Sequence, residues 1–168
     1  MSLIDVAPEV LGENIKKEAQ SKFMLACLPM FHGFGLVMGI LTLMLHGGAD
    51  SILPKFRSQK VVDLIEKNKC NIIIGVPAMF EALLKNKNFY GEKLKNIDIC
   101  FIGGDFIPPS LLQRFNKKLE ENGSKAKVFE GYGLTETVTV MSVNTFENNC
   151  LGSVGKPINN VKVKILDD

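Results

Sequence analysis

The chain has 168 residues, of which 46% are hydrophobic and 23% charged, and 20 basic against 18 acidic side chains give a net charge of +2. This is the composition of one globular domain that is long enough to bury a core, and no internal repeat or low-complexity segment interrupts it. The small net charge implies no polyanionic partner, and no aromatic RNA-binding signature is present, so we expect no nucleic acid ligand.

The apolar periodicity predicts elements that alternate between helices and strands. In chain order, the first are a helix over Met1–Gln20, a strand over Phe23–Leu28, a helix over Leu36–Leu45 closed by His46, a strand over Ala49–Leu53 and a helix over Ser58–Lys69 capped by Ser58. There follow a strand over Asn71–Val76, a helix from Pro77, a strand over Ile97–Ile102, a helix after Pro109 that ends at Gly123, strands over Lys127–Phe129 and Val138–Val143, and an edge strand over Val161–Leu166. This order predicts an α/β fold, with a mostly parallel sheet flanked by helices and a short β-rich segment at the C-terminal end.

One stretch, from Phe23 to Ala49, contains no Asp, Glu, Lys or Arg and is long enough to cross a membrane. Pro29, His32 and the glycines at 33, 35 and 39 interrupt it. We therefore predict a buried strand followed by a buried helix, and no integral membrane span.

The cysteines and histidines argue against a zinc site. The four cysteines form no C-x-x-C pair, and His32 and His46 are the only histidines. Cys27 and Cys100 lie in apolar runs that are typical of reduced core residues. Since no secretory signal is apparent either, the sequence favours a cytoplasmic location.

The stretch Phe129–Thr137 is the strongest candidate for a ligand site. Two glycines flank Tyr132, so the backbone can approach a ligand closely while the tyrosine ring offers a stacking face. Thr135 and Thr137 can donate hydrogen bonds to phosphate oxygens, and Glu136 is a hard oxygen ligand that suits Mg²⁺. The pattern therefore indicates a nucleotide site, although a glycine turn with an exposed Glu would look the same.

Three more unusual loops also begin where a predicted strand ends. In parallel sheets the connections after the strands meet at one rim, which is where ligands bind. Turns without a common function would fall equally often at the opposite rim. The clustering favours a ligand site built from four loops: Pro29–Gly35, Gly75–Pro77, Gly103–Pro109 and Glu130–Thr137.

These loops resemble the motifs of the adenylate-forming superfamily, which includes acyl- and aryl-CoA synthetases, luciferase-like enzymes and peptide-synthetase adenylation domains. Leu28–His32 is similar to the family's Pro-x-Phe-His segment, and Phe101–Gly104 to its glycine pair before the adenine pocket. Gly131–Thr137 matches the central motif without a departure, and Gly152–Pro157 resembles the segment that follows. The four motifs occur in the family's order and spacing, and the match runs from about Phe23 to the end of the chain.

The resemblance implies a reaction in two steps. The carboxylate of an acid attacks the α-phosphorus of ATP to give acyl-AMP and pyrophosphate, and the thiol of coenzyme A (CoA) then attacks the acyl-AMP. The expected substrates are a small carboxylic acid, ATP and CoA, with Mg²⁺ as the metal ion. The residues from Phe31 to Phe34 favour a fatty or aryl acid over an amino acid.

The resemblance also implies a role for each motif residue. Three are expected to be catalytic: Thr135 at the α-phosphate, Glu136 as the Mg²⁺ ligand and His32 beside the carboxylate. The nucleotide would bind between the ring of Tyr132 and the backbone of the glycine pair, with contacts from Gly103, Gly104, Gly131, Tyr132, Gly133 and Thr135. The acyl pocket would be lined by His32, Gly75, Val76 and Gly131.

Several residues allow a structural interpretation as well. His32 could be a core histidine whose ring bonds to backbone, and Tyr132 could simply fill the end of the sheet. Asp105 is more plausible at the start of a helix than as a ribose ligand.

The resemblance further implies that residues 1–168 are a single α/β subdomain of a larger enzyme. The family's phosphate loop would lie upstream and its lid domain downstream, so we expect little or no ligase activity from this chain alone. Apolar surface on Leu36–Leu45 could then make the chain a homo-oligomer. The alternative is a non-catalytic α/β module that binds nucleotide or only oligomerises.

Overall fold

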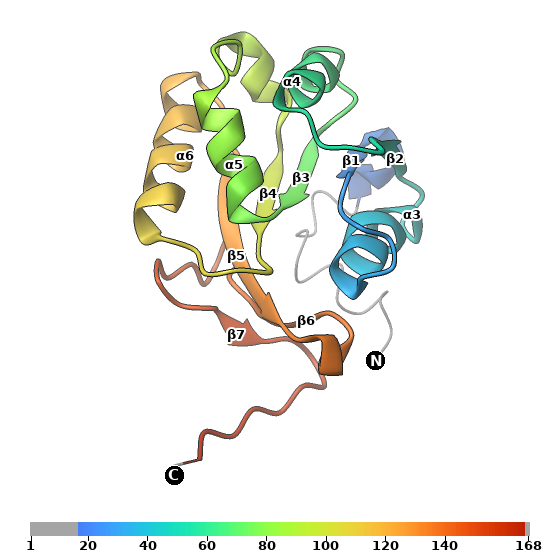
Figure 1. Cartoon of the computed structure of the whole chain (residues 1–168), viewed down its shortest axis with the longest axis vertical. Helices are drawn as coiled ribbons and strands as arrows, with labels where there is room; N and C mark the ends of the chain where they lie inside the picture. The colour runs from blue at the N-terminus through green and yellow to red at the C-terminus, as the bar shows by residue number, and fades with distance from the viewer. Residues whose placement is uncertain (1–16, 167–168) are drawn as a thin grey trace.

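The computed structural model describes residues 17–166, which form one mixed sheet with helices on its faces (Figure 1). The strand order is β2-β1-β3-β4-β5-β6-β7. The strands are β1 (Phe23–Ala26), β2 (Ala49–Ile52), β3 (Ile72–Gly75), β4 (Ile99–Ile102), β5 (Lys127–Gly133), β6 (Val140–Val143) and β7 (Lys156–Pro157). The helices are a π-helix η2 (Phe34–Leu41) that continues into α3 (Thr42–Met44), then α4 (Ser58–Glu66), α5 (Pro77–Lys85) and α6 (Pro109–Glu121), with short 3₁₀ turns at Ala19–Ser21, Glu92–Asn96 and Thr135–Thr137.

The sheet is parallel from β2 to β5 and antiparallel beyond it. The change occurs within β5. Its first half, as far as Glu130, pairs in parallel with β4, whereas its second half, from Gly131, pairs antiparallel with β6. The α/β fold class and the short β-rich C-terminal segment are therefore confirmed.

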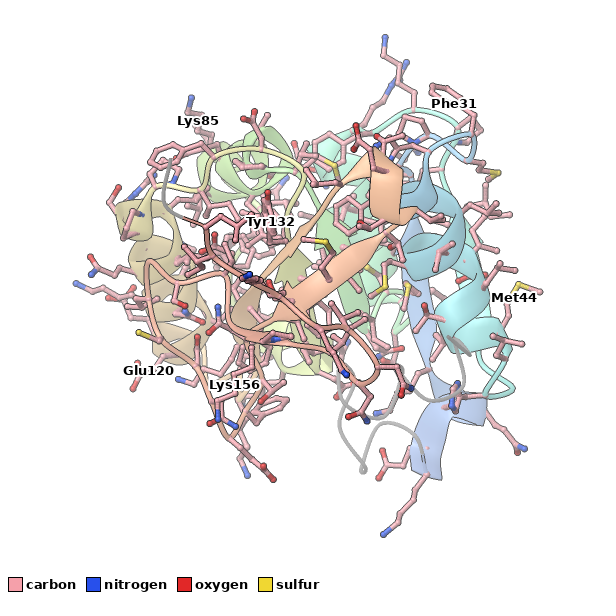
Figure 2. All side chains as sticks on the ribbon, turned by 90° about the horizontal axis from the view of Figure 1, so that it is seen from below. Phe31, Met44, Lys85, Glu120, Tyr132 and Lys156 are labelled. Atoms are coloured by element: carbon pink, nitrogen blue, oxygen red, sulfur yellow. The ribbon has the colours of Figure 1, made fainter. Side chains whose placement is uncertain are left out.

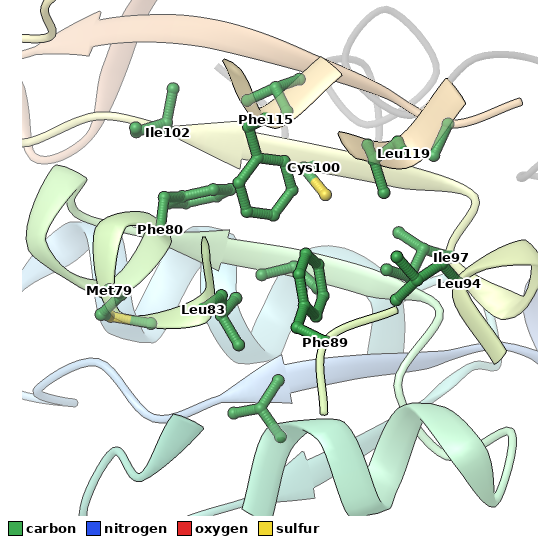
Figure 3. Close-up of a cluster of buried hydrophobic side chains, with 14 of the residues drawn as sticks. Met79, Phe80, Leu83, Phe89, Leu94, Ile97, Cys100, Ile102, Phe115 and Leu119 are labelled. Carbon is green, nitrogen blue, oxygen red and sulfur yellow. The ribbon is translucent and has the colours of Figure 1, made fainter. Parts of the chain in front are cut away.

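The larger core lies between the parallel strands and the helices α4, α5 and α6. Phe115 of α6 is fully buried, and its ring centroid lies 4.9 Å from that of Phe80 and 5.3 Å from that of Phe89 (Figure 3). Leu83, Leu119 and Cys100 of β4 belong to the same layer. The helices contribute to it because their apolar residues recur at helical spacing on one face. The opposite face of the sheet packs against η2 and α3 through Met38 and Leu43, together with Met24, Ile72, Ile74, Phe101 and Phe129 of the strands.

The predicted capping role of Ser58 and the predicted edge strand are wrong. Ser58 is the first residue of α4 rather than its cap, and its hydroxyl instead accepts a bond from the side chain of Asn86. Val161–Leu166 forms no strand, because among residues 17–166 the sheet ends at β7, which leaves this alternating segment without a neighbouring strand. An alternating pattern reports which side chains would share a face, but a strand also needs a partner for its backbone.

The helix expected over Leu36–Leu45 begins two residues earlier, and its first part is a π-helix. Its burial is only partial, because Met44 and Leu45 are about half exposed at 53% and 49%. His46 closes it as predicted, with Nδ1 bonded to the carbonyl oxygen of Thr42 at 3.0 Å. Most of the helix predicted for Met1–Gln20 lies outside the described residues. No helix within residues 17–166 has the length and apolar character needed to cross a membrane.

Candidate functional site

A cavity of about 790 Å³ opens at the carboxyl ends of β1, β4 and β5. Figure 2 looks onto this end of the sheet, where Tyr132 lies over the middle of the molecule while Phe31 and Met44 project from its periphery. Three of the four loops singled out from the sequence line the cavity, with further residues from β6 and from the segment after it. The lining segments include His32, Phe34, 101–107, 130–136, 138–140, Gly152 and Val154.

Most of the predicted site residues line this one cavity. These are His32, Gly103, Gly104, Gly131, Tyr132, Gly133, Thr135 and Glu136. The predicted pocket residues Gly75 and Val76 do not line it, although the Cγ1 atom of Val76 lies 3.5 Å from where a Cβ at Gly104 would stand. The structure thus brings these residues together, while the role of each stays a prediction.

The glycine pair after β4 is required by the close approach of two loops. A Cβ at Gly103 would lie 2.7 Å from the carbonyl oxygen of Gly131, so a side chain there would push the loops apart. Gly104 has φ +80°, a conformation that L side chains rarely adopt. Both glycines therefore bring bare backbone to the cavity wall, next to the loop that carries Tyr132.

The side chain of His32 is exposed, which contradicts the interpretation of a core histidine. Its Nδ1 accepts the backbone N–H of Phe34 at 3.1 Å. In the neutral ring the proton then resides on Nε2, which is left as a hydrogen-bond donor. The loop around it is ordered by two backbone bonds, from His32 N to the oxygen of Pro29 and from Leu36 N to the oxygen of His32.

Thr135 and Glu136 occupy a single 3₁₀ turn directly after β5. Their side chains are exposed and have no hydrogen-bond or ion-pair partner within residues 17–166, so both are available to a ligand. Thr137, the other threonine expected to donate to phosphate, is used differently. Its hydroxyl bonds to the backbone of Leu134 and Thr139, so it belongs to the loop's own structure.

Sequence reasoning missed two polar groups of the cavity wall. Glu130 and Thr139 both line the cavity, and each has a buried side-chain oxygen without a partner among the described residues. Burial raises the pKa of the Glu130 carboxyl above its ordinary value. The alternation of β5 was a usable signal, because Glu130 stands two residues before Tyr132 and so shares its face of the strand.

Asp105 also lines the cavity and does not begin a helix. Its Oδ1 accepts the N–H of Phe106 at 2.7 Å, whereas the N-cap position of α6 is Pro108. The expected helix-start role is therefore wrong. The double proline explains it, since a helix that begins with Pro at its first position needs one fewer capping partner.

The donor set of the cavity fits a metal ion that arrives with phosphate and not a resident metal centre. Among residues 17–166 there is no group of three or more His, Cys, Asp or Glu side chains placed to hold a metal. One unpaired carboxylate, that of Glu136, faces solvent at the cavity. Mg²⁺ commonly binds through one or two carboxylates, with water and substrate phosphates as its other ligands.

Comparisons with known proteins agree with this fold and cavity. Residues 6–168 match the family described as AMP-binding enzyme. The chain is 33% identical over 145 residues to the acyl-CoA ligase sidI of Aspergillus fumigatus, covering 83% of this chain and 24% of that protein. It is 30% identical over 169 residues to 4-coumarate-CoA ligase 1 of Narcissus pseudonarcissus, covering 96% of this chain and 30% of that protein.

A solved structure gives the same result. O-succinylbenzoate coenzyme A synthetase (MenE) from Bacillus subtilis, in complex with ATP and magnesium ion, matches with a TM-score of 0.70 and 29% identity, covering 88% of this chain and 30% of that one. The chain therefore belongs to the AMP-binding enzyme family, and the resemblance inferred from its motifs is confirmed. It spans only 24% to 30% of the length of these relatives.

Proposed function

We propose that the protein takes part in the ATP-dependent activation of a carboxylic acid as acyl-AMP, followed by transfer of the acyl group to the thiol of CoA. The observation that carries this proposal is the convergence of His32, Tyr132 and the Thr135–Glu136 turn on one cavity. Such a reaction needs positioning and charge neutralisation more than covalent chemistry from the protein, and the cavity offers donors, a carboxylate and apolar walls.

The nucleotide would bind between the ring of Tyr132 and the bare backbone of Gly103 and Gly104. Glu130 supports this placement, because its carboxylate belongs to the same wall and a carboxylate can accept a hydrogen bond from the amino group of adenine. Thr135 would then donate to the α-phosphate. An Mg²⁺ ion held by Glu136 would neutralise phosphate charge as the negatively charged acid approaches.

The acid would occupy the apolar part of the cavity. Phe34, Met38, Phe101, Val140 and Val143 line this part, which suits the hydrocarbon of a fatty or aryl acid. The Nε2–H of His32 can donate to the carboxylate of that acid. Gly75 and Val76 stay in the proposal as residues beside the pocket, because Val76 lies next to Gly104 of the cavity wall.

We also propose that residues 1–168 form one subdomain of a larger enzyme, in keeping with the share of the relatives that they span. The 168-residue chain should then release no pyrophosphate above background with ATP, Mg²⁺ and a panel of acids, and robust turnover would contradict this part of the proposal. The exposed apolar side chains of Leu36, Met44 and Leu45 support a homo-oligomer of the chain. A strict monomer in light scattering at high concentration would count against it.

Binding is the direct test of the proposed function. A non-hydrolysable acyl-adenylate mimic should bind the chain saturably, and Mg²⁺ should tighten the binding of ATP. Glu136→Gln should abolish the Mg²⁺ effect, while Glu120→Gln on the exposed face of α6 should leave it intact. Absence of mimic binding and of any thermal shift would overturn the proposal and favour the non-catalytic module.

A further inference from the structure

The two loops that carry the predicted catalytic residues touch through their backbones. A Cβ at Gly33, the neighbour of His32, would lie 1.6 Å from the carbonyl oxygen of Val138 and 2.7 Å from its carbonyl carbon. No side chain fits there unless one loop moves. The position of the His32 loop is therefore tied to that of the segment just after Glu136.

The backbone of Val138, which makes this contact, has an unusual conformation. It has φ +69° and ψ −45°, in a region where non-glycine residues are rare and a β-branched residue is strained. The side chain is 60% exposed, so burial of the side chain does not account for the strain. The surrounding hydrogen bonds must impose it.

Those hydrogen bonds centre on the hydroxyl of Thr137. Its oxygen accepts the N–H of Leu134 at 3.1 Å, and its proton can go to the carbonyl of Leu134 at 2.9 Å or of Thr139 at 3.1 Å. One side chain thus ties together the residues before and after the Val138 turn. The two ends of the loop are also in close backbone contact, because a Cβ at Gly133 would lie 2.0 Å from the carbonyl oxygen of Thr139.

We propose that Thr137 is a positioning residue, whose hydroxyl holds the strained Val138 turn and thereby sets the His32 loop relative to Thr135 and Glu136. The acid-binding donor and the phosphate-binding groups then move as one unit. The significance of this coupling rests on the proposed function, since that function is what requires the acid and the α-phosphate to be held in a fixed relation. The coupling itself is a property of the chain without ligand.

Amide hydrogen exchange of the ligand-free 168-residue chain, read by NMR, tests the coupling. Thr137→Val keeps the shape of the side chain but removes its hydrogen bonds. We expect exchange about tenfold faster at the amides of Thr137 and Val138, and also at those of Phe34 and Leu36 in the other loop. The ring nitrogen signals of His32 should shift as its bond from Phe34 loosens.

Two matched variants separate coupling from general damage. Thr137→Ser keeps the hydroxyl and should preserve both loops. Thr145→Val makes the same chemical change outside the cavity, at a hydroxyl without a bond among the described residues, and should change neither loop. Faster exchange in Thr137→Val that stays confined to residues 134–138, with His32 unchanged, would overturn the proposal.

A second route covers the case in which Thr137→Val does not fold. Val138→Gly relieves the strained φ, and glycine also lets the turn leave its fixed conformation while Thr137 is kept, so the contact with Gly33 should loosen. The unfolding temperature should then hold or rise while the Phe34 and Leu36 amides exchange about threefold faster. Unchanged exchange at those two amides would contradict the coupling. Because no nucleotide is present in these measurements, failure of the wild type to bind the mimic would contradict only the proposed function.

Discussion

Two buried polar sites at opposite ends of the parallel strands differ in their hydrogen bonding. At the amino ends, the buried side chain of Asn71 is fully bonded: it accepts the N–H of Phe23 at 3.0 Å and donates to Asn68 at 2.6 Å and to the carbonyl of Asn96 at 2.9 Å. At the carboxyl ends, Glu130 and Thr139 have buried oxygens without partners among the described residues. The protein itself satisfies the hydrogen bonding of Asn71, whereas these oxygens of Glu130 and Thr139 have no partner among residues 17–166.

The aromatic residues show the same contrast. Phe115 is fully buried in the helix-covered core, whereas Phe31 is 96% exposed at the carboxyl end. A buried ring contributes to stability through lost water contact and close packing, which an exposed ring does not. Substitutions should therefore cost stability in the core and at the amino ends, and cost mainly ligand binding at the carboxyl ends.

The largest effect is expected for Phe115→Ala. It removes a ring that packs on Phe80 and Phe89 and leaves a cavity, so the free energy of unfolding should fall by about 4 kcal/mol. Urea denaturation followed by circular dichroism measures this. Phe31→Ala is the matched control at the other end and should change stability by less than about 0.5 kcal/mol. A similar loss of stability in both variants would refute the contrast between the buried and the exposed ring.

The next largest effect is expected for Asn71→Ala. Three hydrogen bonds disappear and the partly buried N–H of Phe23 loses its partner, so the free energy of unfolding should fall by about 2–3 kcal/mol. Asn149→Ala, in an exposed loop where the side chain makes no bond within residues 17–166, should be nearly neutral. Equal denaturation midpoints for the two variants would show that Asn71 does not tie the strands together.

Asp50 departs from this comparison, because it lies at the amino end of the edge strand β2, away from the cavity, and still lacks a partner. Both of its carboxylate oxygens are buried without a partner among residues 17–166, and burial raises the pKa of the carboxyl from 3.8 to about 6. The folded state therefore binds this proton more tightly than the unfolded chain does. Its stability should fall as the pH rises from about 4 to 6, where the folded protein must accept the buried charge.

Asp50→Asn should remove this dependence. A shift of two pKa units corresponds to about 3 kcal/mol for a fully buried group, and partial contact with solvent reduces the expected gain at pH 7 to about 1 kcal/mol. Below about pH 4 the gain should vanish, because Asp50 is then protonated in both states. Thermal unfolding of both proteins at pH values from about 3 to 8, a range that brackets the two pKa values, measures the difference in stability. A difference that does not vary with pH would rule out titration of Asp50 as its cause.

The parts of the structure that depend on neighbouring residues in the sequence were predictable. Runs such as Ile72–Gly75 and the helical spacing of α6 determine elements of fixed period, and parallel crossovers then place the loops at one rim. The cavity's glycines and Thr135–Glu136 were found in this way. The hydrogen bonding of Thr137 was not, since its three bonds depend on the fold of the loop and not on residue type. The sequence also could not show that Val161–Leu166 has no strand to pair with, because this depends on which strands lie beside it in the fold.

The smallest effect on stability is expected for Tyr132→Ala, at the centre of the cavity. The side chain is 42% exposed, so its loss should change the free energy of unfolding by less than about 0.5 kcal/mol. If adenine stacks on it, affinity for the acyl-adenylate mimic should nevertheless fall about tenfold or more, since a stacked base is worth about 1–3 kcal/mol.

Tyr132→Phe keeps the stacking face and should keep the affinity. Tyr90→Ala, at a tyrosine that is 56% exposed and lies away from the cavity, should alter neither quantity. Isothermal titration of the three variants and the wild type compares their affinities directly. Stability lost at Tyr132 without any loss of affinity would mean that the ring fills the end of the sheet and that the carboxyl ends resemble the amino ends after all.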